Sequence, residues 1–416
     1  MKYIYIIFAS VLFSPAIFGQ QLSFPGAEGF GRFASGGRGG AVYRVTNLDD
    51  SGSGSFRDAV SRPGRTVIFD VSGVIRINDK IKAAPDITIA GQTAPGAGIT
   101  VYGNSVSFSS NSVIRDVRFR GSDEMPRGAC VVIADSLDKL ILDHVSIEWG
   151  RWDDLHIKNS TNITLQYCLV ADGIDPQRFG ALIENPRFVT IYHCLWADNQ
   201  SRNPKAKAKI EYVNNVIYNW GVSGLVGGHS AMDHYQDVVG NYFIAGPNSN
   251  GNFLAMFTAT DHVYQRDNMV DLNKDGILNG RAMTNEDLVN EKATVLGQPT
   301  LLANDLKPGT PADAYKIVIA QAGASLQRDA IDNRIIGFVT SLGKDGRIVH
   351  SVAEAGGQPA IIEVHSRLKD KDGDGIPDSW ETAHHLNPTD AADAKTVGPG
   401  GYTHLELYVN SLSKTK

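Results

Sequence analysis

The sequence predicts an all-β fold in which short strands wind into a parallel β-helix. Between residues 115 and 244 six similar segments recur, each a short alternating run bounded by Gly, Asn, Asp or Pro. Units of this length cannot bury their own apolar face, so they stack into a solenoid. The long outer face of such a solenoid suits an extended polymer. The aligned centres of the six segments are Val117, Val145, Cys168, Cys194, Val216 and Tyr242.

Length and composition fit one large core with a small added module. The chain has 416 residues, 43 glycines and 20% charged residues. A net charge of −6 gives no reason to expect nucleic acid or an acidic membrane surface as a partner. An anionic substrate would therefore need a local group of cations.

Residues 1–19 are predicted to be an export signal rather than part of the fold. Lys2 precedes an apolar run from Tyr3 to Phe13, and small residues follow around Ala16. The run is shorter than the about 20 residues that a transmembrane anchor needs. We therefore expect a secreted protein without such an anchor, in the periplasm, at the cell surface or outside the cell.

The cysteines and a set of polar residues are predicted to be structural. Cys130, Cys168 and Cys194 are odd in number and show no Cys-x-x-Cys spacing, so we expect small apolar core residues. The polar residues that precede the aligned centres are expected to stack along the solenoid. They are Asp116, His144, Tyr167, His193, Asn215 and Asn241.

Several short blocks of sequence carry a resemblance to a known family, and they occur in the same order as in that family. They are Phe24 to Gly31, Gly36 to Gly40, Val45 to Val60, Val67 to Gly73, Ile89 to Gly96, Asp143 to His144, Ser201 to Pro204 and Ala322 to Ala330. In these blocks, over about residues 24–345, the chain resembles the pectate lyases of polysaccharide lyase family 1, in particular the exported Bacteroidetes enzymes. The resemblance implies a right-handed parallel β-helix and β-elimination on polygalacturonate, usually with Ca²⁺.

Such a reaction needs a base for the C5 proton and positive charge for the neighbouring carboxylate. The chain offers cations at Arg202, Lys205 and Lys207. The resemblance assigns the catalytic base to Arg202 and a substrate-binding position to Lys207. Lys205 is a further substrate-binding candidate from the same group of cations. Lys207 replaces an arginine of the family pattern, and it supplies a point charge instead of a two-bond clamp. The alternative is that these lysines form only the solvated face of a strand.

The resemblance also implies a substrate-binding cation at Arg178, where the family carries a lysine. An arginine there would grip a uronate carboxylate as well or better. The alternative is a surface charge on a loop.

A catalytic calcium site is where the chain departs from the family pattern. The first pair of family ligands falls near Gly128 and Cys130, which bind a hard cation poorly. The second pair falls near Asp153 and Asp154, which we expect on a loop as calcium ligands. Asp123 and Glu124 could complete this site from the previous turn.

A second calcium site is predicted near the C-terminus, with a structural role. Residues 370–381 show the spacing of an EF-hand-type loop, with Gly375 at the sixth position. This region resembles the small C-terminal calcium modules of secreted bacterial hydrolases. The predicted ligands are Asp370, Asp372, Asp374, Asp378 and Glu381. A weaker loop begins at Asp271, but Ala282 stands at its twelfth position.

We therefore expect a β-helix at 20–345, a connecting region at 346–365 and an EF-hand-like calcium-binding module at 366–416. The expected protein is a monomeric endo-type pectate lyase that uses Ca²⁺ and acts on homogalacturonan, leaving 4,5-unsaturated products. A pectin lyase remains open, as does a hydrolase on the same solenoid, which would need two carboxylates about 5 to 9.5 Å apart. A non-catalytic protein that binds pectic glycans is a third possibility.

Overall fold

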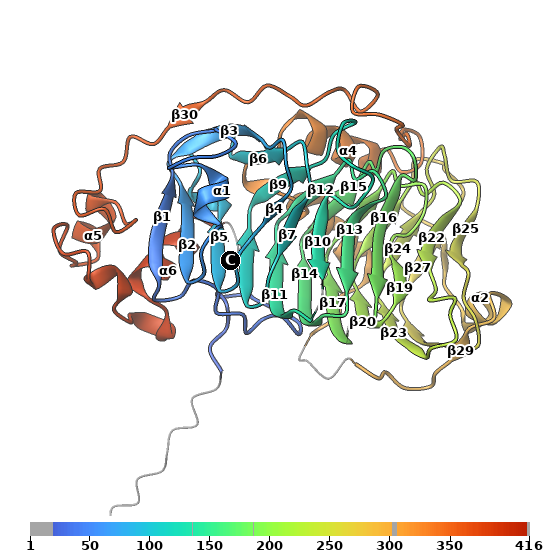
Figure 1. Ribbon diagram of the computed structural model, residues 1–416. Helices are drawn as coiled ribbons and strands as arrows, with labels where there is room; N and C mark the ends of the chain where they lie inside the picture. The colour runs from blue at the N-terminus through green and yellow to red at the C-terminus, as the bar shows by residue number, and fades with distance from the viewer. Residues whose placement is uncertain (1–19, 135, 186, 302–305, 414–416) are drawn as a thin grey trace, which may run out of the picture.

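The computed structural model describes residues 20–134, 136–185, 187–301 and 306–413, so the expected export signal lies outside the described residues. The strands form three sheets that wind around one axis (Figure 1). Almost all neighbouring strands pair in parallel, which confirms the predicted β-helix. Among the described helices, none combines the length and apolar character that a membrane crossing requires.

Each coil of the solenoid contributes up to one strand to each sheet. The first sheet contains β1 (Ala41–Val45), β2 (Arg65–Phe69), β5 (Ile87–Ala90), β8 (Ser112–Arg115), β11 (Asp138–Asp143), β14 (Thr161–Gln166), β17 (Arg187–Tyr192), β20 (Lys209–Val213), β23 (His234–Val239), β26 (Asp261–Arg266) and β29 (Thr294–Val295). The second sheet contains β4 (Ile81–Lys82), β7 (Val106–Phe108), β10 (Val131–Ala134), β13 (Asp153–Lys158), β16 (Phe179–Glu184), β19 (Lys205–Lys207), β22 (Ser223–Val226) and β25 (Asn252–Ala255). The third sheet contains β30 (Val364–His365), β3 (Val71–Arg76), β6 (Ile99–Tyr102), β9 (Val117–Arg120), β12 (Ser146–Glu148), β15 (Leu169–Ala171), β18 (Leu195–Ala197), β21 (Val216–Tyr218), β24 (Tyr242–Ile244), β27 (Met269–Asp271) and β28 (Arg281–Ala282).

The inward side chains of the three sheets form one continuous apolar core along the solenoid. Cys130, Cys168 and Cys194 are all free and fully buried in this core. This confirms their predicted role as small apolar core residues.

The repeat alignment is correct in its first four segments and one residue out of register in the last two. Pairing places Leu195 opposite Val216 and Val216 opposite Tyr242. Cys194 is therefore level with Asn215 rather than with Val216. The alignment assumed that only apolar residues occupy this inward-facing position, which Cys194 and Asn215 share on neighbouring coils. An asparagine fits there because its side-chain oxygen accepts the Cys194 N–H at 2.9 Å.

The predicted polar stack consists of two separate ladders. On the outside, the Tyr167 ring stacks on His144 and His193, with ring centres 4.9 and 5.4 Å away. Inside, the Asn215 amide donates to the Asn241 side-chain oxygen at 3.0 Å, and Asn241 continues the ladder to Asn268 on the next coil. Both ladders link coils, so the structural interpretation of these residues holds. Asp116 belongs to neither ladder.

The glycine-rich N-terminal segment runs along the outer face of the first sheet. The Phe30 N–H donates to Thr190 Oγ1 at 3.0 Å, and the Gly31 N–H donates to Thr164 Oγ1 at 2.8 Å. A Cβ atom on Gly31 would lie 2.2 Å from the Leu140 carbonyl oxygen. Only glycine allows this close approach, which explains the motif as a packing device.

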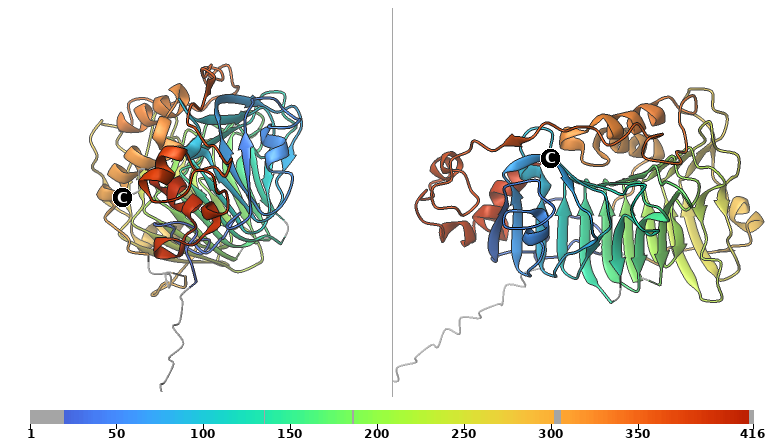
Figure 2. Two further views of the ribbon diagram at one scale, coloured as in Figure 1. Left: turned by 90° about the vertical axis from the view of Figure 1, so that its left-hand side faces the viewer. Right: turned by 45° about the horizontal axis from the view of Figure 1, so that its top comes forward.

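The helices lie outside the coil. They are α1 (Phe56–Ala59), α2 (Asn285–Asn290), α3 (Pro311–Gln321), α4 (Ala330–Thr340), α5 (Asp378–Ala383) and α6 (His404–Ser411), with 3₁₀ turns η1 (Gly91–Thr93), η2 (Ser325–Gln327), η3 (Asp393–Lys395) and η4 (Pro399–Gly401). Val318 of α3 and Ile335 of α4 pack on the outer face of the third sheet, against residues such as Leu169 and Leu195. Figure 2 shows these helices as an orange layer beside the strands.

The last part of the chain returns to the first coils. Residues 346–365 run along the solenoid, and β30 pairs antiparallel with β3, with His365 opposite Val71 (Figure 1). Leu405 and Tyr408 of α6 then pack on Ile68 and Ala90, on the outer face of the first sheet. The C-terminal segment therefore covers the coils that the N-terminal residues build.

Candidate active site on the second sheet

The predicted catalytic arginine lies where three adjacent strands of the second sheet begin. Phe179 at the start of β16 pairs with Asp153 at the start of β13 and with Ser201. Arg202 follows Ser201 directly. Neighbouring coils therefore bring together residues that are 23 to 49 positions apart in the sequence.

A bulge sets the direction of Arg202. Phe179 pairs with Ser201, but Leu182 pairs with Lys205, so the pairing offset grows by one residue between these two points. Arg202 lies in this extra stretch with a φ of 62°. Bulges of this kind re-aim side chains and are frequent next to active sites.

Two neighbours fix the Arg202 guanidinium. Its Nη1 lies 2.9 Å from Asp153 Oδ1, and its carbon centre lies 4.2 Å from the middle of the Phe179 ring. The Arg202 side chain remains 20% exposed, whereas that of Asp153 is only 4% exposed. Burial raises the pKa of Asp153 to about 7, although Arg202 acts in the opposite direction. Asp153 therefore orients the arginine, and its negative charge weakens below neutral pH.

Lys205 and Lys207 lie on the outer face of β19, with the fully buried Ala206 between them. Lys205 is opposite Leu182, and Lys207 is opposite Glu184. Burial and the positive charges of Arg202 and Lys207 lower the pKa of Lys205. Three cations therefore act on one another electrostatically, which makes this surface attractive to an anionic polymer.

Arg178 precedes Phe179 and adopts a positive φ of 59°. Its Nε lies 3.4 Å from Asp175 Oδ1, and its Nη1 lies 3.0 Å from the ring nitrogens of His350. Residues 346–365 thus help to position this cation. Phe179 follows Arg178 in the chain and carries the Arg202 guanidinium over its ring, and the substrate-binding role of Arg178 stays a prediction.

The predicted calcium ligands do not converge on this site. Asp153 and Asp154 begin strand β13 instead of lying on a loop, and successive strand residues point to opposite faces. Asp154 is fully buried and accepts the Gly150 N–H at 2.8 Å. Asp123 accepts the Val352 N–H instead of completing the site. Within the described ranges, no three His, Cys, Asp or Glu ligand atoms gather here. These residues do not fit a calcium cage, and the catalytic calcium stays a prediction.

Sequence reasoning missed the continuation of the surface along the second sheet. Strand pairing aligns one row of outward positions across six strands. This row is Lys82, Ser107, Val132, His156, Leu182 and Lys205. Lys80 and Lys82 line a hollow of ≈ 670 Å³ at one end. Near the other end, His156 Nε2 lies 3.1 Å from Glu184 Oε1. Only the register between coils reveals this row.

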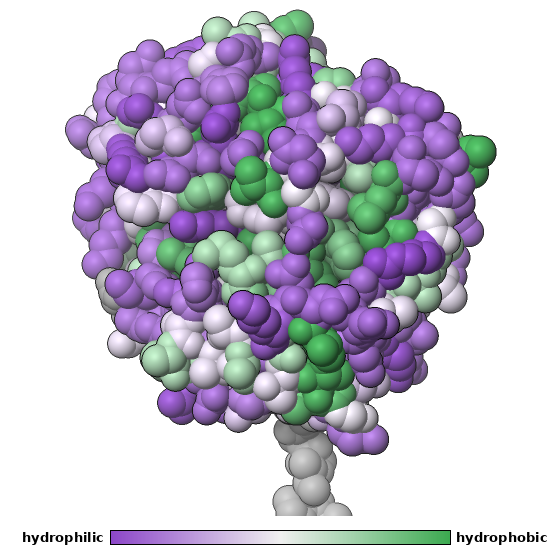
Figure 3. All heavy atoms as spheres, turned by 90° about the vertical axis from the view of Figure 1, so that its right-hand side faces the viewer, coloured by the Kyte–Doolittle hydropathy of each residue, from purple (hydrophilic) through white to green (hydrophobic). Residues whose placement is uncertain are grey.

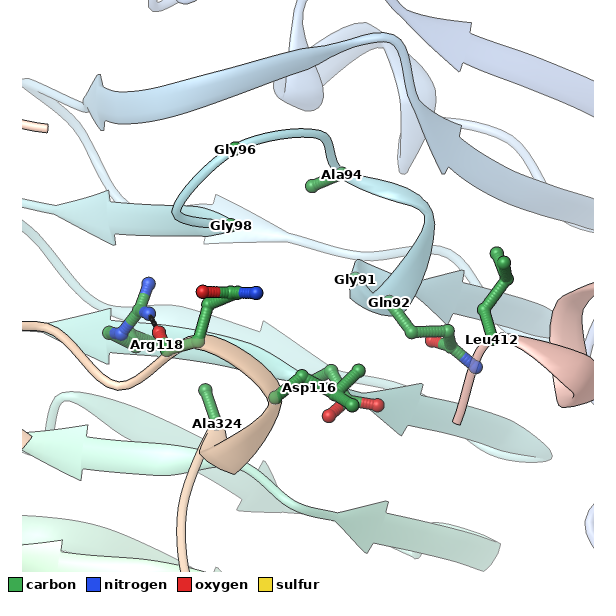
Figure 4. Close-up of a pocket in the computed structure, with 11 residues that line it drawn as sticks. Gly91, Gln92, Ala94, Gly96, Gly98, Asp116, Arg118, Ala324 and Leu412 are labelled. Atoms are coloured by element: carbon green, nitrogen blue, oxygen red, sulfur yellow. Dashed lines mark hydrogen bonds between the residues drawn. The ribbon is translucent and has the colours of Figure 1, made fainter. Parts of the chain in front are cut away.

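Another hollow, of ≈ 370 Å³, lies beside the third sheet and the C-terminal segment (Figure 4). Gln92, Asp116, Arg118 and Leu412 are among its lining residues. The Arg118 guanidinium donates to the carbonyl oxygens of Gln327 and Ala97. Its charge is used to hold the backbone, so this hollow lacks the exposed cation group found on the second sheet.

Comparison with solved structures supports the fold. The cedar pollen allergen jun a 1 superimposes with a TM-score of 0.55, covering 71% of this chain and 92% of its own, at 17% identity. The thermostable pectate lyase PL 47 gives a TM-score of 0.53, with 75% and 100% coverage and 13% identity. No family model matches the sequence.

Curated relatives extend over almost the whole chain. Probable pectate lyase C of Aspergillus flavus is 42% identical over 403 residues, which are 94% of each chain. That of Aspergillus fumigatus is 40% identical over 412 residues, which are 97% of this chain and 98% of the relative. Together with the β-helical fold, these relatives place the chain in the class of polysaccharide lyases. On this identity and coverage, the chain belongs to the pectate lyases. These relatives are fungal, so the expected Bacteroidetes branch stays a prediction.

Proposed function

We propose that the protein cleaves de-esterified homogalacturonan inside the polymer chain by β-elimination. The observation that carries this proposal is the partly exposed Arg202, held by Asp153 and Phe179 beside Lys205 and Lys207. The pectate lyase relatives share about two fifths of the residues over nearly the whole chain. The product would carry a 4,5-unsaturated sugar at its new non-reducing end.

The proposed reaction assigns distinct tasks to the cations. Arg202 removes the C5 proton, the electron pair of the C–H bond forms the C4–C5 double bond, and the glycosidic oxygen leaves from C4 with the bonding pair and takes a proton from water. Lys205 and Lys207 neutralise the uronate carboxylate, on which negative charge builds during proton removal. A guanidinium can take up the C5 proton only in its neutral form, which is rare at neutral pH.

Calcium is not given a step in this reaction. Ca²⁺ stays an expected cofactor of the family, but the described carboxylates do not form a cage for it on this face. The neutralising charge is therefore assigned to the cations of the protein itself.

The length of the outer surface supports internal cleavage. The row from Lys82 to Lys205 crosses six strands, which corresponds to about 24 Å at the usual strand spacing. Its ends carry cations, and the hollow beside Lys82 lies away from Arg202. A polymer can bind on both sides of the scissile bond, which favours endo-type action.

The alternative functions are less well supported. A hydrolase would need two carboxylates that flank the scissile bond, but of the two candidates Asp153 is almost buried and Asp154 is fully buried. A pectin lyase would recognise neutral methyl esters, for which a group of cations is unsuited. A mere glycan-binding protein would not need the fixed orientation of Arg202.

We also propose that the protein is exported and monomeric. Export follows from the predicted signal at residues 1–19. The end of the solenoid shown in Figure 3 is largely hydrophilic, with apolar residues scattered in small groups. Such a face offers no extended apolar patch for a second copy.

Incubation with polygalacturonate should generate ultraviolet absorbance of a conjugated unsaturated uronate. The absorbance should rise together with a rapid fall in viscosity, because internal cuts shorten the polymer quickly. New reducing ends without absorbance would establish hydrolysis. The absence of both signals across a panel of pectins would favour the binding protein.

Replacement of Arg178 by alanine should raise KM and lower kcat, with kcat/KM falling about 10- to 100-fold. The cation pairs with a uronate carboxylate in both the ground state and the transition state. Steady-state kinetics on polygalacturonate measure this effect. Arg62→Ala removes an exposed arginine from the N-terminal part of the chain and should leave both constants unchanged. Equal effects of the two variants would contradict the assigned role.

A further inference from the structure

A second group of carboxylates lies in the C-terminal segment, well separated in sequence from Arg202. Asp370, Asp372 and Asp374 gather their oxygens within 4.8 Å of one another. Asp374 also belongs to a second such group, with Glu381 of α5 and Asp393 of η3. The groups share one residue, so the acidic oxygens form a continuous cluster.

In Asp372 and Asp374 the loop geometry directs one carboxylate oxygen to the backbone and leaves the other without a partner. Asp372 Oδ1 and Asp374 Oδ1 accept the N–H groups two residues further on, at 3.4 and 2.8 Å. Their Oδ2 atoms are buried and accept no hydrogen bond from the described residues. Asp393 shows the same division, since Oδ2 accepts the Asn387 N–H and Oδ1 has no described partner.

Glu381 gives the strongest indication of a cation site. The residue is 0% exposed, and neither of its carboxylate oxygens has a hydrogen-bond partner within the described ranges. A buried carboxylate without a counter-charge costs several kcal/mol in general, so proteins rarely retain one unpaired. A bound cation would remove this penalty.

The loop that begins at Asp271 shows that acidic spacing alone does not create such a site. There, Asp275 Oδ2 accepts hydrogen bonds from Asn273 and Asn279 at 3.0 and 2.9 Å. Asp271 Oδ2 accepts the Asn279 N–H at 3.2 Å. This loop satisfies its own oxygens, and the two carboxylate groups of the described chain do not include it.

We propose that the C-terminal segment binds Ca²⁺ through two separate stretches of chain. Asp372, Asp374 and Glu381 supply oxygens from the loop and α5, and Asp393 closes the site from η3. Hard oxygen ligands without nitrogen or sulfur favour Ca²⁺ over transition metals. Asp378 lies outside both groups, and its Oδ1 accepts the Lys371 N–H at 2.8 Å. The fourth ligand is therefore Asp393, which the loop spacing does not reveal.

The site holds the C-terminal segment on the β-helix. Asp370 belongs to the cluster and also pairs with Arg44 of β1, and Arg44 in turn lies 2.6 Å from Asp70. Ile376 packs against Ile68 in the same apolar group as α6. Calcium would thus fix the loop, η3 and the outer face of the first coils relative to one another.

Terbium luminescence tests the site directly on the full-length protein. Trp380 adjoins Glu381 and can transfer excitation to Tb³⁺, which resembles Ca²⁺ in its ligand preference. We expect sensitised emission that Ca²⁺ displaces, and a rise in Tm on adding Ca²⁺ to chelated protein. Emission that does not appear, or a Tm that does not respond, would overturn the proposal.

Matched variants test the two-stretch ligand set. Asp393→Asn keeps the size of the side chain and should weaken Ca²⁺ binding about tenfold or more, because it removes a charged ligand. Asp275→Asn makes the same change in the self-satisfied loop and should leave binding unchanged. Glu381→Gln should abolish both the sensitised Tb³⁺ emission and the rise in Tm with Ca²⁺. If Glu381→Gln fails to fold, the Ca²⁺ affinity of Asp393→Asn tests the proposal instead. Equal affinities of Asp393→Asn and the unchanged protein would exclude Asp393. Lyase activity of Asp393→Asn is measured in parallel, so that a failure of the calcium proposal can be told apart from a failure of the proposed reaction.

Discussion

Arg202→Lys should lower kcat on polygalacturonate about 10²- to 10⁴-fold, the usual contribution of a positioned acid or base. Lysine keeps the positive charge. It cannot reproduce the planar group that bonds Asp153 at 2.9 Å while lying 4.2 Å from the centre of the Phe179 ring. The loss should appear in kcat because the guanidinium acts on the C5 proton in the transition state.

Thermal unfolding shows whether this loss is chemical or structural. Arg202 is partly exposed, so Arg202→Lys should melt close to the unchanged protein. Arg187→Lys makes the same exchange at an exposed position of the first sheet and should retain full activity. Full activity in Arg202→Lys would remove this residue from the role of base. A large drop in Tm would instead assign it a structural role.

Arg120→Met should give the largest loss of stability, about 3 to 5 kcal/mol, because it leaves buried carboxylates without their cation. Arg120 is fully buried and lies 2.8 Å from Glu148 and 3.0 Å from Asp332. It also pairs with Asp329, which caps the first turn of α4. The substitution therefore weakens both the coil interface and the attachment of α4. Chemical denaturation, followed by circular dichroism, measures the change.

A surface arginine provides the control for this prediction. Arg266 pairs with Asp267 at 3.1 Å, but the two side chains are 51% and 66% exposed. Exposed pairs contribute about 0 to 1 kcal/mol, so Arg266→Met should have little effect. Similar stabilities of the two variants would show that the buried cluster does not hold α4 on the third sheet.

The sequence predicted the fold well because its repeats encode strands directly. The alignment failed at Asn215 and Asn241, where amides replace apolar residues at the inward-facing position. Such an exchange is invisible to a hydrophobic pattern, because the hydrogen bonds that permit it come from the next coil.

In the candidate site, too, some residues could be predicted from the sequence and others could not. Arg202 and the lysines lie in one short motif, which sequence resemblance detects. The contacts of Arg202 with Asp153 and Phe179 depend on the register of three coils, and Asp154 is fully buried, where it accepts the Gly150 N–H. Asp393 was missed because it lies 12 residues beyond Glu381, outside the loop pattern.

The return of the chain to its first coils affects the order in which folding can be completed. Solenoids grow by contacts between neighbouring repeats, so the N-terminal coils can stack as soon as they are synthesised. However, Ile68 and Ala90 are covered only when Leu405 and Tyr408 arrive, and Arg38 gains its 2.6 Å contact with Glu406 at the same stage. The part of the solenoid that is made first is therefore finished last, after nearly the entire chain has been released.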